Sequence, residues 1–512
     1  MPLLPAFIML RSLRRLSAML SLGAPALAAQ DITFRVVIPD SQPRLAQVDV
    51  TLPAKNDTIG FSSFGASQFP EGWRKFVTKL DVRDERGAVI ATTPLPNGKW
   101  LAPGAGGHSI RLRYDVFLSH DRYVWQSKKN EAAYGEEWGV FYLGRALFAT
   151  GGNAALPDTV NVSFTLPRDW QIDTQWEPFA SDPHTFRVPR PYLWASGIVM
   201  GHYDRREVLV GNTRAVHALG GLEPGTGSPR LEENTRELLE QYASRFGALP
   251  IGGRVLYVIG FDSTFDGRAG AGVVGRTITQ LAPMRRIPDG AHGGLLRTMA
   301  HEYQHLWNGW TIGTAGVNEE WFKEGVTEYY STLTIRRLVK ATDEQFLARL
   351  REHLGHYLAY AGREPPSAQG ERKGSDDAIV YSGGLAIGLA LDLEIRERTN
   401  GARSLDDFMR LAMTRREPFT NADLLTGLQK ATGIDFSEFF ARHVTGREVI
   451  PVETYLAKAG IEVVRGATPA ATAQPDMHGG GPQIGIARLP RLARAAHPTA
   501  QQESVWSAWV KR

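Results

Sequence analysis

The stretch His301-Glu302-Tyr303-Gln304-His305 restricts the fold of this 512-residue chain more than any other feature of its sequence. Residues four apart on a helix lie on one face, so the two imidazoles can reach a single metal ion if this stretch is helical. Glu302, about 100 degrees round the helix axis, could then face a metal-bound water. Composition alone would produce such a pentapeptide roughly 0.02 times in a chain of this length, which disfavours two ordinary core histidines. The sequence therefore predicts a helix that carries a metal site.

A third ligand is expected, because a catalytic zinc site usually has three protein ligands and one position open for water. Eighteen residues separate His305 from Glu324, which stands in a Trp-x-x-Glu-Gly context within a second predicted helix. A lone glutamate on a helix is usually solvated, but the partner motif disfavours that alternative. We predict one Zn²⁺ ion per chain, held by His301, His305 and Glu324.

Glu328 lies one turn beyond Glu324 on the same face of this predicted helix. From there it could orient a ligand histidine through a hydrogen bond. An exposed surface carboxylate is an equally good interpretation of this residue.

Residues 30–230 contain short runs of alternating apolar and polar residues, such as 33–38, 47–52 and 109–114, separated by Pro, Gly, Asn and Asp. This spacing predicts an antiparallel β domain. Its histidines are scattered without ligand spacing, so we expect no metal site there. A lectin-like or adhesive function of this half has no supporting motif.

The pattern changes near residue 231, where residues 231–242 have helical periodicity and residues 254–259 indicate a buried strand. Residues 276–281 are interpreted as an edge strand, and the chain beyond residue 292 is predicted to be mostly helical. Helices are expected to begin near Thr342 and at Ser404. Residues 464–512 are rich in Pro, Ala and Gly and are predicted to form a loosely ordered tail.

Four stretches resemble the glycyl aminopeptidase family of gluzincins, which is related to thermolysin and aminopeptidase N. They are residues 301–308, 321–330, 391–410 and 436–463. The resemblance implies a multidomain chain with a β domain before an α+β thermolysin-like zinc peptidase domain that is mostly helical in its C-terminal half. The predicted division is a signal peptide at 1–29, the β-rich domain at 30–230, the catalytic domain at 231–463 and the tail at 464–512.

The resemblance also implies a role for Tyr381, because the family carries a tyrosine before a glycine and an apolar helix. Its hydroxyl would donate a hydrogen bond to the oxyanion of the transition state. Relatives often have lysine where this chain has Gly383, and a packed or helix-capping tyrosine is the alternative.

Two departures from the family concern specificity. Relatives carry a Gly-x-Glu-His element before the zinc helix, whose glutamate can bind a free amino terminus, whereas Gly270 to Gly275 contain no carboxylate. We expect an extended substrate to bind along the edge strand near 273–281, with contacts at Gly272, Val273, Val274 and Gly275. Too few residues follow Gly460 for the complete PDZ domain that ends many relatives.

The N-terminal segment has a basic stretch ending at Arg15, an apolar run to about Ala26 and small residues after it. This pattern predicts a signal peptide and an exported, periplasmic or secreted protein, by the general or the twin-arginine route. The apolar run is too short to span a bilayer, so no stable membrane span is expected after removal of the signal. Without Arg11, Arg14 and Arg15, 55 basic residues face 54 acidic ones, so no nucleic-acid partner is expected.

These observations predict a zinc metallopeptidase that acts on peptides or proteins, with Glu302 as general base for a zinc-bound water. The absence of cysteine excludes thiol catalysis and cysteine-ligated metal sites. A catalytically impaired zinc-binding or scaffold protein is the alternative, which the presence of Glu302 disfavours. The sequence does not define an oligomeric state.

Overall fold

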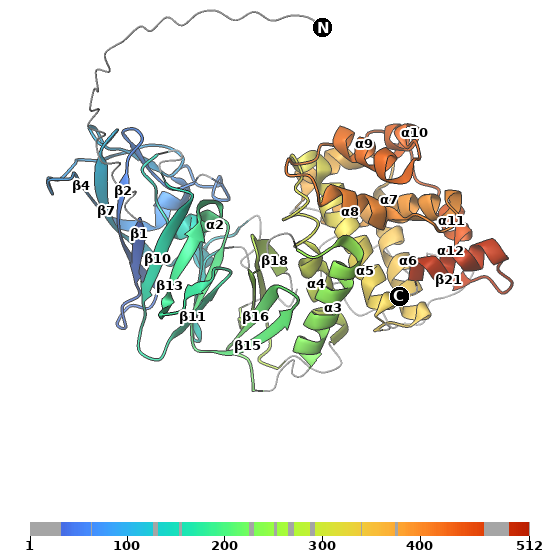
Figure 1. The fold of residues 1–512 in the computed structure, drawn as a ribbon, viewed down its shortest axis with the longest axis horizontal. Helices are drawn as coiled ribbons and strands as arrows, with labels where there is room; N and C mark the ends of the chain where they lie inside the picture. Colours follow the sequence, from blue (N-terminus) through green and yellow to red (C-terminus); the bar gives the residue numbers. More distant parts are fainter. Residues whose placement is uncertain are drawn as a thin grey trace, which may run out of the picture.

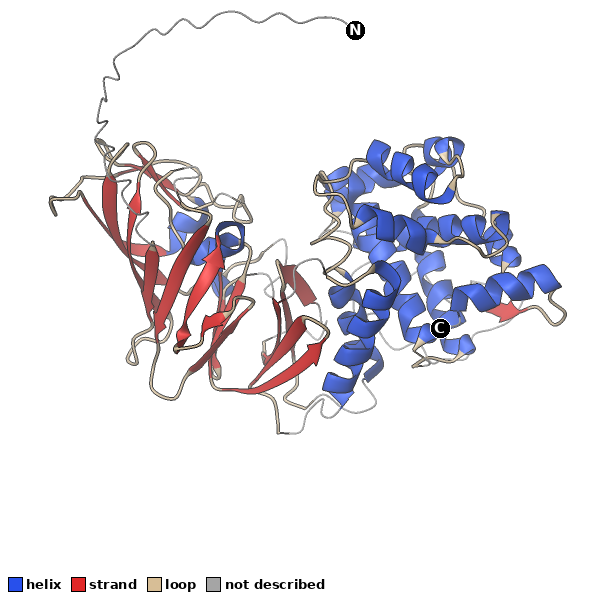
Figure 2. Ribbon diagram, viewed as in Figure 1, coloured by secondary structure: helices blue, strands red, loops and turns tan. Residues whose placement is uncertain are grey.

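A computed structural model describes residues 32–62, 64–125, 132–152, 156–224, 230–249, 253–264, 271–286, 292–338, 340–373, 377–464 and 491–510. The chain is rich in β-sheet in its first part and helical in its C-terminal half, as predicted (Figure 1, Figure 2). The predicted signal peptide lies outside the described residues. Among the helices that the structure describes, none is both long and apolar enough to cross a membrane.

The largest sheet of the N-terminal region has the strand order β12-β13-β10-β1-β2-β7-β4. Neighbouring strands are antiparallel except for β1 and β10, which pair in parallel, a detail that residue alternation cannot reveal. In β2 the residues Ala46, Val48, Val50 and Leu52 are buried and alternate with more exposed ones, as expected for a sheet with one covered face. The strands are β1 (Thr33–Val37), β2 (Leu45–Pro53), β4 (Val77–Arg83), β7 (Ser109–Phe117), β10 (Thr159–Thr165), β12 (Pro178–Phe179) and β13 (Asp182–Pro189).

Two smaller sheets and several short helices complete this region. The strand orders are β11-β14-β9-β8 and β3-β6-β5. The strands are β3 (Thr58–Gly60), β5 (Thr93–Pro94), β6 (Lys99–Leu101), β8 (Tyr134–Glu136), β9 (Gly139–Leu143), β11 (Gln171–Thr174) and β14 (Gly197–Gly201). The helices are η1 (Gly72–Phe76), η2 (His120–Arg122), α1 (Gly144–Leu147) and α2 (Arg190–Trp194).

A five-stranded sheet of order β15-β16-β17-β19-β18 joins the two halves. In β17, Val255, Tyr257 and Ile259 belong to the core of the helical half, whereas Leu256 and Val258 belong to the core of the β-rich region. Burial on both faces explains why the predicted strand at 254–259 is a continuous apolar run. The bounds are β15 (Tyr203–Val210), β16 (Thr213–Gly220), β17 (Gly253–Phe261), β18 (Ala271–Val274) and β19 (Thr277–Ala282).

This sheet corrects one expectation and bears on another. The strand predicted at 276–281 is present as β19, but its predicted position at the edge of the sheet is wrong. Strand β19 is buried along its whole length between β17 and β18. The edge is β18, which pairs only with β19 among the described strands. Strands β15 and β16 precede the predicted boundary at residue 230 but belong to the same sheet as β17 beyond it, with β16 paired directly to β17. The domain boundaries stay predictions.

The helical half surrounds one large hydrophobic core. The predicted helix at 231–242 is part of α3, and capping boxes at Thr342 and Ser404 begin α6 and α8 where the sequence indicates. The helices are α3 (Arg230–Phe246), α4 (His292–Gln304), η5 (Val317–Glu319), η6 (Trp321–Val326), α5 (Thr327–Arg337), α6 (Asp343–Tyr360), η7 (Pro366–Arg372), α7 (Asp377–Arg398), α8 (Leu405–Ala412), α9 (Asn421–Thr432), α10 (Ser437–His443) and α11 (Val452–Lys458).

Residues 491–510 do not form the loosely ordered tail that the sequence predicts. Strand β21 (Arg491–Arg494) pairs with β20 (Ile461–Val464), and α12 (Ala500–Val510) packs against the core. Trp509 is fully buried and its Nε1 donates a hydrogen bond to the Tyr329 hydroxyl on α5 at 2.8 Å. Val505, Trp506, Trp509 and Val510 recur at helical spacing, a signal that the Pro, Ala and Gly content upstream concealed. Residues 465–490 of that prediction lie outside the described residues.

Candidate metal centre

His301 lies in the last turn of α4 and His305 directly follows the last residue of this helix, so both side chains lie on one face, as residues four apart on a helical turn do. Their side chains are buried, and their Nε2 atoms lie 3.0 Å apart. The backbone amide of His305 donates to the carbonyl of His301 at 3.3 Å, so the helical turn continues to the second histidine. The local fold thus aims both imidazoles at one point.

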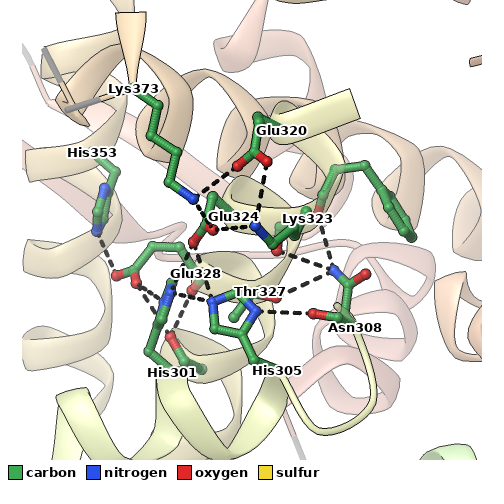
Figure 3. Close-up of polar contacts among 12 residues, drawn as sticks. His301, His305, Asn308, Glu320, Lys323, Glu324, Thr327, Glu328, His353 and Lys373 are labelled. Carbon is green, nitrogen blue, oxygen red and sulfur yellow. Dashed lines mark hydrogen bonds and ion pairs between the residues drawn. The ribbon is translucent and has the colours of Figure 1, made fainter. Parts of the chain in front are cut away.

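The third predicted ligand comes from the π-helical turn η6. Glu324 Oε2 lies 3.1 Å from His305 Nε2 and 3.4 Å from His301 Nε2 (Figure 3). One ligand atom from each of the three residues lies within 4.8 Å of the others. The structure therefore brings together the three side chains that the sequence predicts as ligands.

The other ring nitrogen of each histidine is occupied by a hydrogen bond. His301 Nδ1 donates to Glu328 Oε2 at 2.9 Å, and His305 Nδ1 donates to the Asn308 carbonyl at 2.9 Å. Because both partners only accept, each imidazole has a hydrogen on Nδ1 and directs Nε2 toward the other two side chains. When the imidazoles are neutral, as metal binding requires, two Nε2 lone pairs and a carboxylate converge and form a donor set that fits a cation such as zinc.

The electrostatics of His301 also favour positive charge at this point. Burial alone would lower the pKa of the imidazole, but hydrogen bonds to Glu324 and Glu328 raise this pKa to about 10. A site that binds a proton so firmly would also favour a metal cation, and the cation would displace the proton.

Glu302 lies beside the ligands on α4, and its side chain is buried. Burial raises the pKa of this carboxyl above its usual value, while the two histidines act in the opposite direction. A raised pKa brings a carboxylate closer to the range in which it can accept and return a proton at neutral pH.

Glu328 is buried, with 4% of its surface exposed, so the alternative of a surface carboxylate does not describe it. Its Oε2 accepts from His301, and its Oε1 accepts from Arg349 Nη2 at 3.0 Å and from His353 Nε2 at 2.9 Å. The hydrogen bond to His301 is one of the two interpretations that the sequence allows for Glu328. No sequence pattern indicates the contacts with Arg349 and His353, which lie on α6.

Two lysines surround the remaining oxygen of Glu324 (Figure 3). Lys373 Nζ contacts Glu324 Oε1 and also lies 2.9 Å from Glu320 Oε2, while Lys323 Nζ is 3.3 Å from Glu324 Oε1. The pKa of the Glu324 carboxyl is held well below its usual value: burial opposes this shift, but Lys373 and His305 lower the pKa more strongly. The carboxylate is therefore charged and ready to bind a cation. No local pattern in the sequence indicates Lys373, which is 49 residues from Glu324 along the chain.

Tyr381 lies on α7, and its ring stacks on His301 with ring centroids 5.4 Å apart and planes at 30°. Two glycines permit this closeness. A Cβ on Gly384 would lie 1.9 Å from the Trp321 carbonyl, and one on Gly325 would lie 2.2 Å from Gly384. Because neither residue has a side chain, α7 packs directly on η6, and this contact brings Tyr381 to the metal ligands.

The predicted substrate residues lie on or next to β18. Gly272, Val273 and Val274 belong to this edge strand, and Gly275 follows it. Helix α4 packs against β18, so the edge strand and the ligand helix are neighbours. Two aspartates precede this stretch in the sequence: Asp262 is buried and accepts a hydrogen bond from the Thr264 hydroxyl at 2.6 Å, and Asp266 lies outside the described residues.

Comparison with known proteins agrees with this arrangement. Residues 294–378 match the model of the M61 glycyl aminopeptidase family, which confirms the resemblance predicted from the sequence. This segment contains His301, His305, Glu324 and Glu328. No curated protein matches the chain in sequence. The segment that carries these four residues is thus similar to a peptidase family.

Solved structures show the same fold. An aminopeptidase N family protein from Idiomarina loihiensis has a TM-score of 0.72 and 16% identity, over 86% of this chain and 82% of that protein. An M1 zinc metallopeptidase from Deinococcus radiodurans has a TM-score of 0.53 and 17% identity, over 82% of this chain and 94% of that one. A variant of the latter, bound to a Tyr-Ser-Ala substrate, has a TM-score of 0.51. The chain has an aminopeptidase-like multidomain fold.

Proposed function

We propose that this protein is a zinc-dependent peptidase with a thermolysin-like catalytic domain. The proposal rests above all on the two Nε2 atoms, 3.0 Å apart, that converge on Glu324 Oε2. Three protein ligands would leave a position for water, as catalytic rather than structural zinc sites do. Histidine and carboxylate ligands without thiolates fit a hydrolytic zinc ion.

Each chemical step has a candidate among the residues of the chain. Zinc held by His301, His305 and Glu324 would lower the pKa of a bound water and polarise the substrate carbonyl. Glu302 would accept the proton of that water and deliver it to the leaving amine. The Tyr381 hydroxyl would donate a hydrogen bond to the oxyanion that develops in the transition state.

We further propose that the substrate is a peptide that lies extended along β18. One edge of this strand is not paired with any strand that the structure describes, and Gly272 to Gly275 would form contacts there by strand addition. Because this stretch contains no carboxylate, it would not reward a free amino terminus. An endopeptidase, or an enzyme for an unusual small substrate, is therefore favoured over an aminopeptidase.

The decisive test combines metal analysis with digestion of a peptide library. We expect about one zinc per chain in the purified protein and cleavage products identified by mass spectrometry. Glu302→Gln should keep its zinc and lose nearly all hydrolysis, because an amide has the shape of the carboxylate but cannot accept the proton. Turnover like that of the wild type in Glu302→Gln would remove Glu302 as the base. A zinc-loaded wild type without any cleavage would favour the catalytically impaired scaffold instead.

We also propose that the protein is exported, since its first 29 residues have the pattern of a signal peptide. Cell fractionation with the N-terminal sequence of the mature protein tests this. A chain that retains Met1 in the cytoplasmic fraction would contradict it.

A further inference from the structure

A chain of buried hydrogen bonds runs behind the metal centre, on the far side of His301 from the other ligands. It begins at Glu328, whose two oxygens bind in different directions. Oε2 accepts from His301 Nδ1, and Oε1 accepts from His353 Nε2, both at 2.9 Å. Glu328 lies on α5 and His353 on α6, so this carboxylate connects a metal ligand to a helix that carries no ligand.

The chain continues from α6 to α7. His353 Nδ1 lies 3.1 Å from the hydroxyl of Ser382, and both side chains are buried. Because Nε2 donates to the Glu328 carboxylate, a neutral His353 has a bare Nδ1, which accepts the hydroxyl hydrogen of Ser382. The hydrogen bonds therefore have a fixed direction, from Ser382 through His353 to Glu328.

Ser382 directly follows Tyr381, so the series of contacts returns to His301, where it began. The ring of Tyr381 stacks on the ring of His301, the ligand at which the chain began. Each of the helices α4, α5, α6 and α7 contributes to this closed set of contacts. A shift of Tyr381 relative to the metal ligands would have to break one of them.

The turn of α7 that carries Tyr381 packs directly on η6, and Ser382 connects the same turn to α6. Ser382 is followed by Gly383 and Gly384, which have no side chains to pack or to bond, and glycine is a poor helix former. Helix α7 can pack closely on η6 only because residue 384 is a glycine, since a Cβ there would collide with the Trp321 carbonyl. The packing sets how close α7 lies to η6, and the hydrogen bond of Ser382 adds a directional contact to α6.

We propose that Ser382 and His353 are positioning residues, which hold the Tyr381 hydroxyl over the metal ligands through Glu328. Neither residue touches the substrate. This inference rests on the proposed function, in which Tyr381 binds the oxyanion, and it adds the device that orients Tyr381. A core that is merely well packed would show no link between the effects of Ser382, His353 and Tyr381.

The first test is a double-mutant cycle on peptide hydrolysis. Ser382→Ala removes only the hydroxyl, and alanine is the better helix former, so a folding defect is not expected. We expect this variant to keep its zinc and its KM and to lose about tenfold in kcat, part of what a misplaced oxyanion donor costs. In a Tyr381→Phe background the same substitution should have no further effect. Ser196→Ala, which removes a buried serine hydroxyl from the β-rich region, should leave kcat unchanged.

A second cycle tests His353. His353→Gln should lower kcat about as much as Ser382→Ala, and the double variant should be no worse than either single one, because both break the same connection. An unchanged kcat in Ser382→Ala, or effects that multiply in either double variant, would overturn the proposal.

A measurement without turnover separates this proposal from the proposed function. A phosphinic peptide presents a tetrahedral oxyanion to a zinc peptidase, and calorimetry gives its affinity directly. Ser382→Ala should weaken this binding about tenfold in the zinc-loaded protein, with no further loss in the Tyr381→Phe background. If the wild type binds the phosphinic peptide but cleaves nothing, the proposed function fails while the positioning role is still measured. Equal affinity in the wild type and Ser382→Ala would sink the positioning role alone.

Discussion

Lys373 Nζ contacts Glu324 Oε1, whereas the other oxygen of this carboxylate, Oε2, lies 3.1 Å from His305 Nε2. The two oxygens of Glu324 are thus divided between a lysine and the metal site. A cation bound between the histidines would meet Oε2, because Oε1 is occupied by an ammonium group. In the proposed site Glu324 would therefore act both as a ligand and as a shield between the ion and the charge of Lys373.

This division predicts how zinc affinity responds to substitution. Glu324→Ala should lose more than about 100-fold in zinc affinity, because it removes a ligand and also exposes the ion to the Lys373 ammonium. Adding Lys373→Met to Glu324→Ala should recover part of the loss. Competition with a chromophoric chelator measures both affinities. Lys340→Met, which removes a lysine paired with Glu237 on α3, is the control and should recover nothing. A double variant that binds no better than Glu324→Ala would show that the lysine does not act on the ion.

Tyr381→Phe should keep its zinc content and KM and lose about 100-fold in kcat, the usual effect of removing one oxyanion donor. The stacking on His301 needs only the ring, so phenylalanine should preserve the packing. Steady-state kinetics with a single peptide, together with zinc analysis, measure the change. An unchanged kcat would return Tyr381 to a packing role.

The absence of a carboxylate between Gly270 and Gly275 predicts the mode of cleavage. Burying a substrate ammonium without an anionic partner would cost several kcal/mol, so the site should not select a free amino terminus. An acetylated peptide should be cleaved at least as fast as the same peptide with a free amine, as judged by mass spectrometry. Stepwise removal of single residues from the free peptide alone, with glycine or alanine preferred, would contradict this and indicate an aminopeptidase.

His120 predicts a loss of stability in acid. Its ring is buried against Phe76, with ring centroids 3.6 Å apart, and burial together with the charge of Arg44 lowers the pKa of this histidine to about 3. Below about pH 6.5 the unfolded chain binds a proton that the folded chain excludes, so folding weakens by up to about 1.4 kcal/mol for each pH unit down to pH 3. His120→Phe should make the melting temperature fall less steeply between pH 7 and pH 4.5. A variant with the slope of the wild type would show that His120 does not titrate on unfolding.

The sequence revealed those parts of the site that follow from local periodicity. His301, His305 and Glu324 stand at spacings that only helices make meaningful, and the structure brings their ligand atoms together. His353 and Lys373 reach the centre from 25 and 49 residues away along the chain, so no local pattern could indicate them. The order of the strands was equally hidden, because an apolar strand such as β19 can occupy the centre or the edge of a sheet.

The hydrogen bond between Trp509 and Tyr329 has a consequence for the order in which the molecule matures. Tyr329 follows Glu328 on α5, and 180 residues separate it from Trp509. On the ribosome His301, His305 and Glu324 emerge long before α12, so the helix that supports α5 is made well after the predicted ligands. A nascent chain therefore has an interval in which these residues exist without this support.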